Sequence, residues 1–404
     1  MRTTALFAFC FGLLLVSAAQ ANDSLNIRFV GSCTTPGDAR GLAVSGSYAY
    51  VADWNAGLRV ISVADPAHPV EVGHFDGPDS ATAVAISGNF AYIIDVSAGL
   101  RVVSVVDPAS PVEVGHWDTP GHAYRVAVDG NYAYVADVDS GLWVISVADP
   151  AHPAVTGHLD LTMAIGLAAS GHFIYVADYL DGLHVISVAN PTNPAEVGHN
   201  ESLGYLCLAV RGNYAYVGED KMYIVSLADS SRPRSVGSST LHDPARGVAV
   251  DSACAYSIGD SKLDAVSVSD PGNPVAIGYY HRPFVNAYGV SATGGYIYVI
   301  DDSGLSVCQR YGAGVEDITK ANPLTTECGT VVVRGILVWT SEHSSRNSAS
   351  DAELIDALGR RLCDLHPGTN DISRLSPGVY FVRERSAVSF ERPPSGIRKV
   401  IITR

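Results

Sequence analysis

Apolar and polar positions alternate along most of the chain in short segments that end at Gly, Pro, Asp or Ser. One period can be followed through residues 81–118, as ATAVAISG, NFAYIID, GLRVVSVVDP and PVEVGHWD. Each segment is rich in β-branched or aromatic residues, and alternation with a period of two is typical of β-strands. The period therefore predicts four strands joined by three turns.

The second of these segments recurs down the chain as YAYVAD, AYIID, YAYVAD, IYVAD, YAYVGE, AYSIGD and YIYVID. Its last residue is always acidic: Asp53, Asp95, Asp137, Asp178, Glu219, Asp260 and Asp301. The steps between these acids are 42, 42, 41, 41, 41 and 41 residues. Four short strands in each such period are typical of a β-propeller blade, so seven periods predict seven blades.

The two ends of the repeat region complement each other. Residues 26–39 match only the fourth strand of a period, whereas the seventh period stops after its third strand, at residues 304–311. Pairing of these two strands would close the ring and remove two free sheet edges. We therefore predict an all-β fold in which residues 26–311 form a seven-bladed β-propeller closed by the N-terminal strand.

One tyrosine recurs in the YAYVAD segment of every period. An aromatic ring buries a large apolar area, and its hydroxyl group can reach a polar partner. We therefore expect these residues to pack between neighbouring blades. They are Tyr50, Tyr92, Tyr134, Tyr175, Tyr216, Tyr256 and Tyr298.

The third strand and its proline-rich turn read GLRVISVADPAHP, GLRVVSVVDPASP, GLWVISVADPAHP and GLHVISVANPTNP in the first four periods. These segments resemble the LVIVD-repeat family. The resemblance covers roughly residues 26–311, although the fifth and sixth periods lack the Gly-Leu entry. It implies a β-propeller of the kind found in exported and surface proteins, and it implies no fixed enzymatic activity.

The period disappears after Tyr311, and residues 312–325 have the composition of a linker. Residues 326–404 resemble the C-terminal sorting domain of type IX secretion substrates. The matching positions are DALGRR at 356–361, 375–382 and 398–404, together with Asn322-Pro323 just before this region. The resemblance implies a small β-sandwich that the secretion machinery reads at the bacterial outer membrane.

Residues 1–21 have the pattern of a signal peptide. Arg2 supplies a positive charge, residues 5–16 are apolar, and Ala19-Gln20-Ala21 matches a cleavage site. The apolar run is too short to span a membrane, and no later run of 18 or more apolar residues occurs. We therefore expect a secreted or bacterial cell-surface protein without a transmembrane segment.

The net charge of −15 argues against nucleic acid or an anionic membrane as a partner, because both require clustered Lys and Arg. Six cysteines follow the predicted cleavage site, and none has C-x-x-C spacing. Cys33 and Cys308 both fall in the closing blade, but a plain hairpin register offsets them by about three residues, which is too far to bridge. Pairing of Cys328 with Cys363 stays open.

The recurrent acids should all lie on one face of the propeller. Two interpretations remain: each carboxylate caps its own D-x-x-x-G-L turn, or the acids together attract cations and bind Ca²⁺, which takes several oxygen ligands. The candidate metal residues are Asp53, Asp95, Asp137, Asp178, Asp260 and Asp301.

The residue that precedes the inner glycine of each first strand varies while the scaffold repeats. Variable residues on a rigid frame are where a ligand would be recognised. These positions are Arg40, Thr82, Tyr124, Ile165, Leu206, Arg246 and Tyr288. We take Arg40, Thr82, Tyr124, Arg246 and Tyr288 as the candidate ligand site at the channel mouth. Alternatively, Arg40 pairs with Asp53, and Arg246 with Asp260, as ion pairs within one blade.

His74, His116, His158 and His199 recur in the outermost strand of successive blades. Outer strands of different blades diverge around the ring, so these imidazoles cannot converge on one ion at about 2 Å. The sequence contains no G-x-S-x-G, no G-K-[ST] loop and no H-E-x-x-H, and we assign no catalytic residue.

The leading hypothesis is an exported propeller that acts as a binding or interaction module for a protein or carbohydrate ligand. A second hypothesis is a metal-assisted hydrolase or lyase with its site in the central channel, because propellers support many chemistries. A third is a structural surface component or adhesin.

Overall fold

The computed structural model describes residues 26–310, except 78, 202–206, 282, 283 and 285, together with the strands of the C-terminal region. The chain divides into two compact units, Met1–Arg310 and Tyr311–Arg404. The predicted signal peptide at 1–21 and linker at 312–325 lie outside the described residues. The described residues contain no helix, and so none that is long and apolar enough to cross a membrane.

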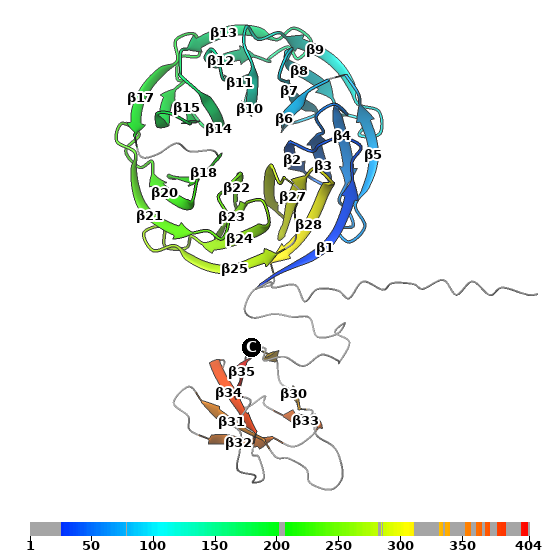
Figure 1. Ribbon diagram of the computed structural model, residues 1–404, viewed down its shortest axis with the longest axis vertical. Helices are drawn as coiled ribbons and strands as arrows, with labels where there is room; N and C mark the ends of the chain where they lie inside the picture. Colours follow the sequence, from blue (N-terminus) through cyan, green and yellow to red (C-terminus); the bar gives the residue numbers. More distant parts are fainter. Residues whose placement is uncertain are drawn as a thin grey trace, which may run out of the picture. The chain divides into compact units, whose positions relative to one another are not determined.

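The first unit is a ring of seven four-stranded antiparallel sheets, as predicted (Figure 1). In the first three blades the chain runs outward through β2 (Gly41–Ser45), β3 (Tyr48–Ala52), β4 (Leu58–Ser62) and β5 (Val70–Phe75); β6 (Ala81–Ser87), β7 (Phe90–Asp95), β8 (Gly99–Ser104) and β9 (Val112–Trp117); and β10 (Ala123–Asp129), β11 (Tyr132–Asp137), β12 (Gly141–Ser146) and β13 (Ala154–Leu159).

The next three blades repeat this order. They comprise β14 (Ala164–Ser170), β15 (Phe173–Asp178), β16 (Gly182–Ser187) and β17 (Ala195–Asn200); β18 (Cys207–Arg211), β19 (Tyr214–Gly218), β20 (Lys221–Ser226) and β21 (Arg234–Thr240); and β22 (Gly247–Val250), β23 (Cys254–Ile258), β24 (Lys262–Ser267) and β25 (Val275–His281).

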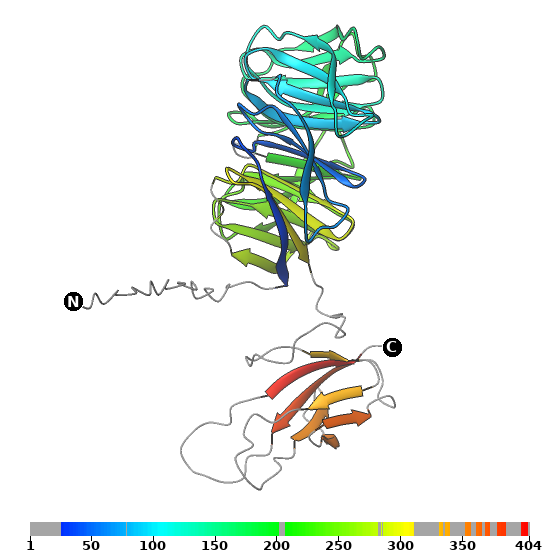
Figure 2. The same cartoon turned by 90° about the vertical axis from the view of Figure 1, so that its right-hand side faces the viewer.

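The seventh blade is built from both ends of the repeat region. It contains β26 (Gly289–Thr293), β27 (Tyr296–Asp301) and β28 (Gly304–Arg310), and its outermost strand is β1 (Ile27–Thr34). β1 pairs antiparallel with β28, and Figure 2 shows it in dark blue beside the yellow strands. Cys33 lies opposite Leu305, Cys308 lies opposite Phe29, and neither cysteine forms a disulfide. The predicted closure and the offset of the two thiols are therefore confirmed.

The core lies between blades. All seven recurrent tyrosines are buried, with 2–5% of their surface exposed. Tyr92 of blade two shares a cluster with Val126, Val135 and Ile145 of blade three, and the other six tyrosines likewise pack with residues of the next blade. Burial raises the pKa of Tyr134 to about 12, as expected for a phenol in an apolar interface. The packing prediction is confirmed.

The C-terminal unit contains a five-stranded sheet in the order β29-β35-β34-β31-β32 and a two-stranded sheet of β30 and β33. The strands are β29 (Val331–Val333), β30 (Ile336–Trp339), β31 (Ala352–Asp356), β32 (Arg361–Leu365), β33 (Gly368–Asp371), β34 (Gly378–Glu384) and β35 (Ile397–Ile402). The predicted β-sandwich, its sorting role and the pairing of Cys328 with Cys363 stay predictions.

Candidate functional site

The innermost strands surround a cavity of about 200 Å³ at the centre of the propeller. Every blade contributes, because the first residues of each inner strand face the channel. Most of these are small or apolar, as in Gly41–Leu42, Gly166–Leu167 and Gly289–Val290. The polar side chains that line the cavity are therefore few: Arg40, Thr82, Arg125, Cys207, Arg246 and Tyr288.

Four of the five predicted channel residues line this cavity: Arg40, Thr82, Arg246 and Tyr288. Tyr124 is not among the lining residues, and 37% of its surface is exposed. The pairing of β10 with β11 shifts register between Ala123 and Arg125, which places Tyr124 in a bulge. Leu206 lies outside the described residues.

Arg125 lines the channel although the sequence interpretation did not select it. The other blades carry Gly, Ala or Cys at this position, so an arginine among small residues was the signal that could have identified it. Its guanidinium lies 4.5 Å from the Tyr124 ring centroid and donates to the Tyr124 carbonyl oxygen at 3.2 Å. Burial lowers the pKa of Arg125, and the described residues place no carboxylate within ion-pair distance of it.

Arg40 is held between two aromatic rings. Its guanidinium carbon lies 4.2 Å from the Trp54 ring centroid and 5.0 Å from that of Tyr288, within the range of cation–π attraction. Trp54 has a φ of +44°, which is rare for a bulky residue and marks a constrained position. The Arg40 Nε atom is buried without a hydrogen-bond partner, and its one ion pair is a 3.8 Å contact with Asp38.

The predicted Arg40–Asp53 pair is wrong. Asp53 accepts hydrogen bonds from the Thr35 hydroxyl at 2.7 Å and the Gly37 amide at 2.8 Å, and its nearest cation is Arg59 at 3.9 Å. Arg40 cannot reach it, because its side chain turns toward the channel. The predicted Arg246–Asp260 pair is confirmed, with Nε and Oδ1 2.7 Å apart.

Thr82 adds a second unsatisfied polar atom to the channel. Only 2% of its surface is exposed, and its hydroxyl oxygen has no hydrogen-bond partner among the described residues. A buried hydroxyl without a partner is costly. In the channel, Arg246 is therefore neutralised by Asp260. Arg40, Arg125 and the Thr82 hydroxyl group each still have a hydrogen-bond donor available for a ligand.

The recurrent acids act mainly as turn caps. Asp95 accepts backbone hydrogen bonds from Ser97 and Ala98 in the following turn and from Asp79 in the preceding loop, at 3.0, 3.2 and 3.1 Å. Asp137 and Asp178 accept equivalent bonds, and Asp301 accepts one from Ser303. The capping interpretation is confirmed for these four.

Blade six departs from the pattern. Asp260 is exposed, and Asp243 accepts the turn bonds from Ser261 instead, at 2.7 Å from both its amide and its hydroxyl. Glu219 of blade five accepts no turn hydrogen bond from the residues that the structure describes, and burial raises its pKa. Ca²⁺ binding by the acids stays a prediction, but the carboxylates of Asp95, Asp137 and Asp178 are already engaged within their own blades.

The seven-sheet ring with its central channel defines the molecule as a seven-bladed β-propeller repeat protein. The family described as LVIVD repeat matches residues 36–77, 78–119, 120–160, 163–201 and 207–240. The chain therefore carries LVIVD repeats across residues 36–240, which is part of the range 26–311 that the sequence resemblance covers.

Comparison with solved structures gives a similar fold. The crystal structure of the computationally designed Ika8 protein (crystal packing No.1 in P63) superposes with a TM-score of 0.53 at 10% sequence identity. The match covers 70% of this chain and 99% of the designed one, so it supports the fold alone. None of the curated proteins compared with this chain matches it.

Proposed function

We propose that this protein is a binding module that holds an oxyanion group of its ligand in the central channel. The proposal rests on Arg125, a half-buried cation for which the described residues offer no carboxylate partner. A desolvated charge is stable only when a counter-charge or hydrogen bonds compensate it. A carboxylate of an acidic sugar or peptide, or a sulfate or phosphate group, would supply both.

The neighbouring side chains suit the same ligand. A guanidinium presents planar, paired donors that match a carboxylate or phosphate. Trp54 and Tyr288 hold Arg40 in place before a ligand arrives, which reduces the entropy lost on binding. Thr82 can donate one further hydrogen bond from its unpaired hydroxyl. The site is a local concentration of positive charge in a protein of net charge −15.

The chemistry of the channel favours binding over catalysis. Among the described residues that line it, none is Asp, Glu or His, the usual general bases and metal ligands. Burial raises the pKa of the Cys207 thiol to about 12, so it stays protonated and is a poor nucleophile. These observations weigh against a metal-assisted hydrolase or lyase in the channel.

The test is titration calorimetry with four oxyanion probes: sulfate, phosphate, oligogalacturonate and a glutamate-rich peptide. We expect at least one to bind with unit stoichiometry and Arg125→Gln to weaken it roughly 10- to 100-fold, the effect of losing a hydrogen bond to a charged group. Arg28→Gln is the matched control, because Arg28 is an exposed arginine on β1 that bonds to Gln309. Equal binding by Arg125→Gln would contradict the proposal.

We also propose that the protein acts outside the cytoplasm and that its C-terminal unit engages a secretion machinery. Support comes from the sequence alone: the apolar N-terminal segment with its Ala19-Gln20-Ala21 site and the similarity of residues 326–404 to sorting domains. N-terminal sequencing of the exported protein should begin near Asn22. Retention of residues 1–21 would contradict this part of the proposal.

A further inference from the structure

A side-chain cluster on the outer half of blade four lies apart from the channel. Asp181 precedes β16, His184 lies within β16, and His199 lies opposite His184 on β17, the outermost strand. One ligand atom from each of the three residues lies within 4.8 Å of the others. Among the described residues, this is the one such group of three or more His, Cys, Asp or Glu side chains.

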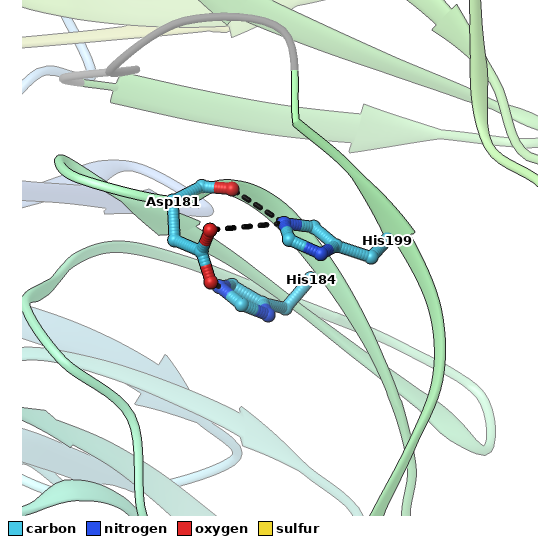
Figure 3. Close-up of side chains that lie close together, drawn as sticks. All are labelled: Asp181, His184 and His199. Carbon is cyan, nitrogen blue, oxygen red and sulfur yellow. Dashed lines mark hydrogen bonds and ion pairs between the residues drawn. The ribbon is translucent and has the colours of Figure 1, made fainter.

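The two imidazole rings present the same edge to Asp181 (Figure 3). Their centroids are 4.5 Å apart, with 12° between the ring planes. The Nε2 atoms of His184 and His199 each lie 3.9 Å from a carboxylate oxygen of Asp181. Two imidazole nitrogens and one carboxylate therefore surround a single point at the protein surface.

His184 is the member of the cluster whose ring nitrogens lack hydrogen-bond partners. Only 4% of its surface is exposed, yet neither ring nitrogen makes a hydrogen bond with a described residue. A buried polar group normally has a partner, so each exception requires an explanation. The Nε2 atom faces Asp181, which is where an ion would supply the missing partner.

Glu196 lies on the opposite side of both rings. Its Oε1 atom is 3.3 Å from Nδ1 of His184 and 3.8 Å from Nδ1 of His199. Histidines that bind a metal usually donate their other N–H to a carboxylate, which fixes the tautomer and orients the ring. Glu196 is close enough to do this for His184, which would leave the Nε2 lone pair of His184 directed at Asp181. Nε2 of His199 contacts the carbonyl oxygen of Asp181, so its lone pair becomes available to an ion only when that contact is given up.

Comparison with the first three blades shows that none of them has this cluster. The residues corresponding to Asp181 and His184 are Ala56 and Arg59 in blade one, Ala98 and Arg101 in blade two, and Ser140 and Trp143 in blade three. Arg59 is held by Glu71 and Asp76, at 3.4 and 2.8 Å, in an ordinary ion-pair network. Blade four replaces that arginine with an imidazole and adds a carboxylate three residues earlier.

The histidine that recurs in the outermost strand is not by itself enough for a metal site. In blade three His158 contacts the carbonyl oxygen of Ser140, and His199 makes the same contact with the carbonyl of Asp181. In blades one and two the outer histidines lie instead beside a glutamate of their own strand, His74 at 3.5 Å from Glu71 and His116 at 3.3 Å from Glu113. Only in blade four does a second imidazole lie opposite it together with an acidic side chain.

We propose that Asp181, His184 and His199 bind a divalent first-row transition ion, with Zn²⁺ as the representative ligand. Imidazole nitrogen suits Zn²⁺, Cu²⁺ and Ni²⁺, whereas Ca²⁺ and Mg²⁺ prefer oxygen. Metal–nitrogen bonds of about 2.0–2.1 Å require the stacked rings to tilt and His199 to exchange its carbonyl contact for the ion. His199 is half-buried on an outer strand, and water would complete the coordination because Asp181 is exposed.

The test is calorimetric titration of the full chain with Zn²⁺, followed by the visible absorption of Co²⁺ in the same site. We expect one ion per chain at this site. His184→Arg should abolish it while leaving the fold intact, because arginine occupies this position in blades one and two. Glu196→Gln should weaken binding about 10- to 100-fold, as loss of an outer carboxylate partner does.

His158→Ala is the matched control, since it removes the corresponding outer histidine from a blade that lacks the second imidazole. It should leave the affinity at the blade-four site unchanged. Unchanged Zn²⁺ binding in His184→Arg, or no Zn²⁺ binding by the wild type at millimolar concentration, would overturn the proposal. Both outcomes are independent of the channel, so they leave the oxyanion proposal untouched.

Discussion

Asp95 shows how a single buried carboxylate can organise a blade. Only 4% of its surface is exposed, and besides three backbone amides it accepts hydrogen bonds from the hydroxyl groups of Ser80 and Ser97. Burial alone would raise the pKa of Asp95, but the hydrogen bonds from Ser97, Ser80 and Asp79 together lower it. The ionised form is therefore the one that the fold stabilises.

Replacement of Asp95 by Asn should destabilise the propeller by about 1–3 kcal/mol at pH 7, the cost of losing hydrogen bonds to a charged acceptor. The lowered folded-state pKa means that the stabilisation is fully present above the unfolded pKa of about 3.9 and is lost as the pH falls through the folded value. The difference between wild type and Asp95→Asn should therefore shrink below about pH 4. Urea denaturation at several pH values measures it.

Asp260→Asn is the matched control, because Asp260 occupies the corresponding position in blade six but is exposed and pairs with Arg246. Exposed ion pairs contribute about 0–1 kcal/mol, so this variant should change stability little. A loss in Asp260→Asn equal to that in Asp95→Asn would contradict the capping role.

Residue-level chemistry was only partly predictable from the sequence. The repeat period predicted that Arg40, Thr82, Arg246 and Tyr288 lie at the channel, and all four line the central cavity. Arg125 was missed because it occupies the inner-glycine position, which the sequence interpretation treated as part of the repeated scaffold rather than as a variable site. His184 was missed because its role depends on a cross-strand neighbour rather than on its own recurrence.

The turns between strands use glycine in two different ways. Gly88 and Gly99 both have positive φ, at +56° and +81°. A Cβ atom at Gly88 would have open space around it, whereas one at Gly99 would lie 2.5 Å from the Thr119 amide nitrogen and the Trp117 carbonyl oxygen. Gly88 is therefore required only for its positive φ. Gly99 is required for its positive φ and because there is no space for a side chain.

Gly88→Ala should cost about 1–2 kcal/mol, the penalty for a non-glycine residue in the left-handed region. Gly99→Ala should cost clearly more, because backbone atoms of the outer strand cannot move aside without breaking the sheet. Thermal melting of both variants measures the difference. Equal losses would mean that the outer strand relaxes around the new methyl group.

Strand order was predictable because each element carries its own alternation, and the turn residues mark its ends. Irregularities of pairing within the strands were not predictable from the sequence. Shifts of register in the inner pairs of blades two, three and four, at 81–83, 123–125 and 164–166, leave no mark on the spacing of apolar residues. The inner pairs of the other four blades keep a continuous register.

The ring as a whole depends on one short strand. β1 pairs along β28 and also contacts β25 of blade six, so it joins the last two blades at the point where the chain closes. Ile27 is its buried anchor, with 1% of its surface exposed, in a cluster with Tyr256 and Phe284. Repeats that contact only their neighbours gain cooperativity when the first is tied to the last.

Ile27→Ala should lower the free energy of unfolding by about 2–5 kcal/mol, since it removes buried methyl groups and leaves a cavity. If closure couples the blades, guanidinium denaturation followed by tyrosine fluorescence should show one transition at a lower midpoint with an unchanged slope. Ser32→Ala, an exposed change on the same strand, should stay within about 0.5 kcal/mol of the wild type. A separate early transition in Ile27→Ala, with the main midpoint unmoved, would instead mean that the last blade unfolds alone and that closure does not couple the ring.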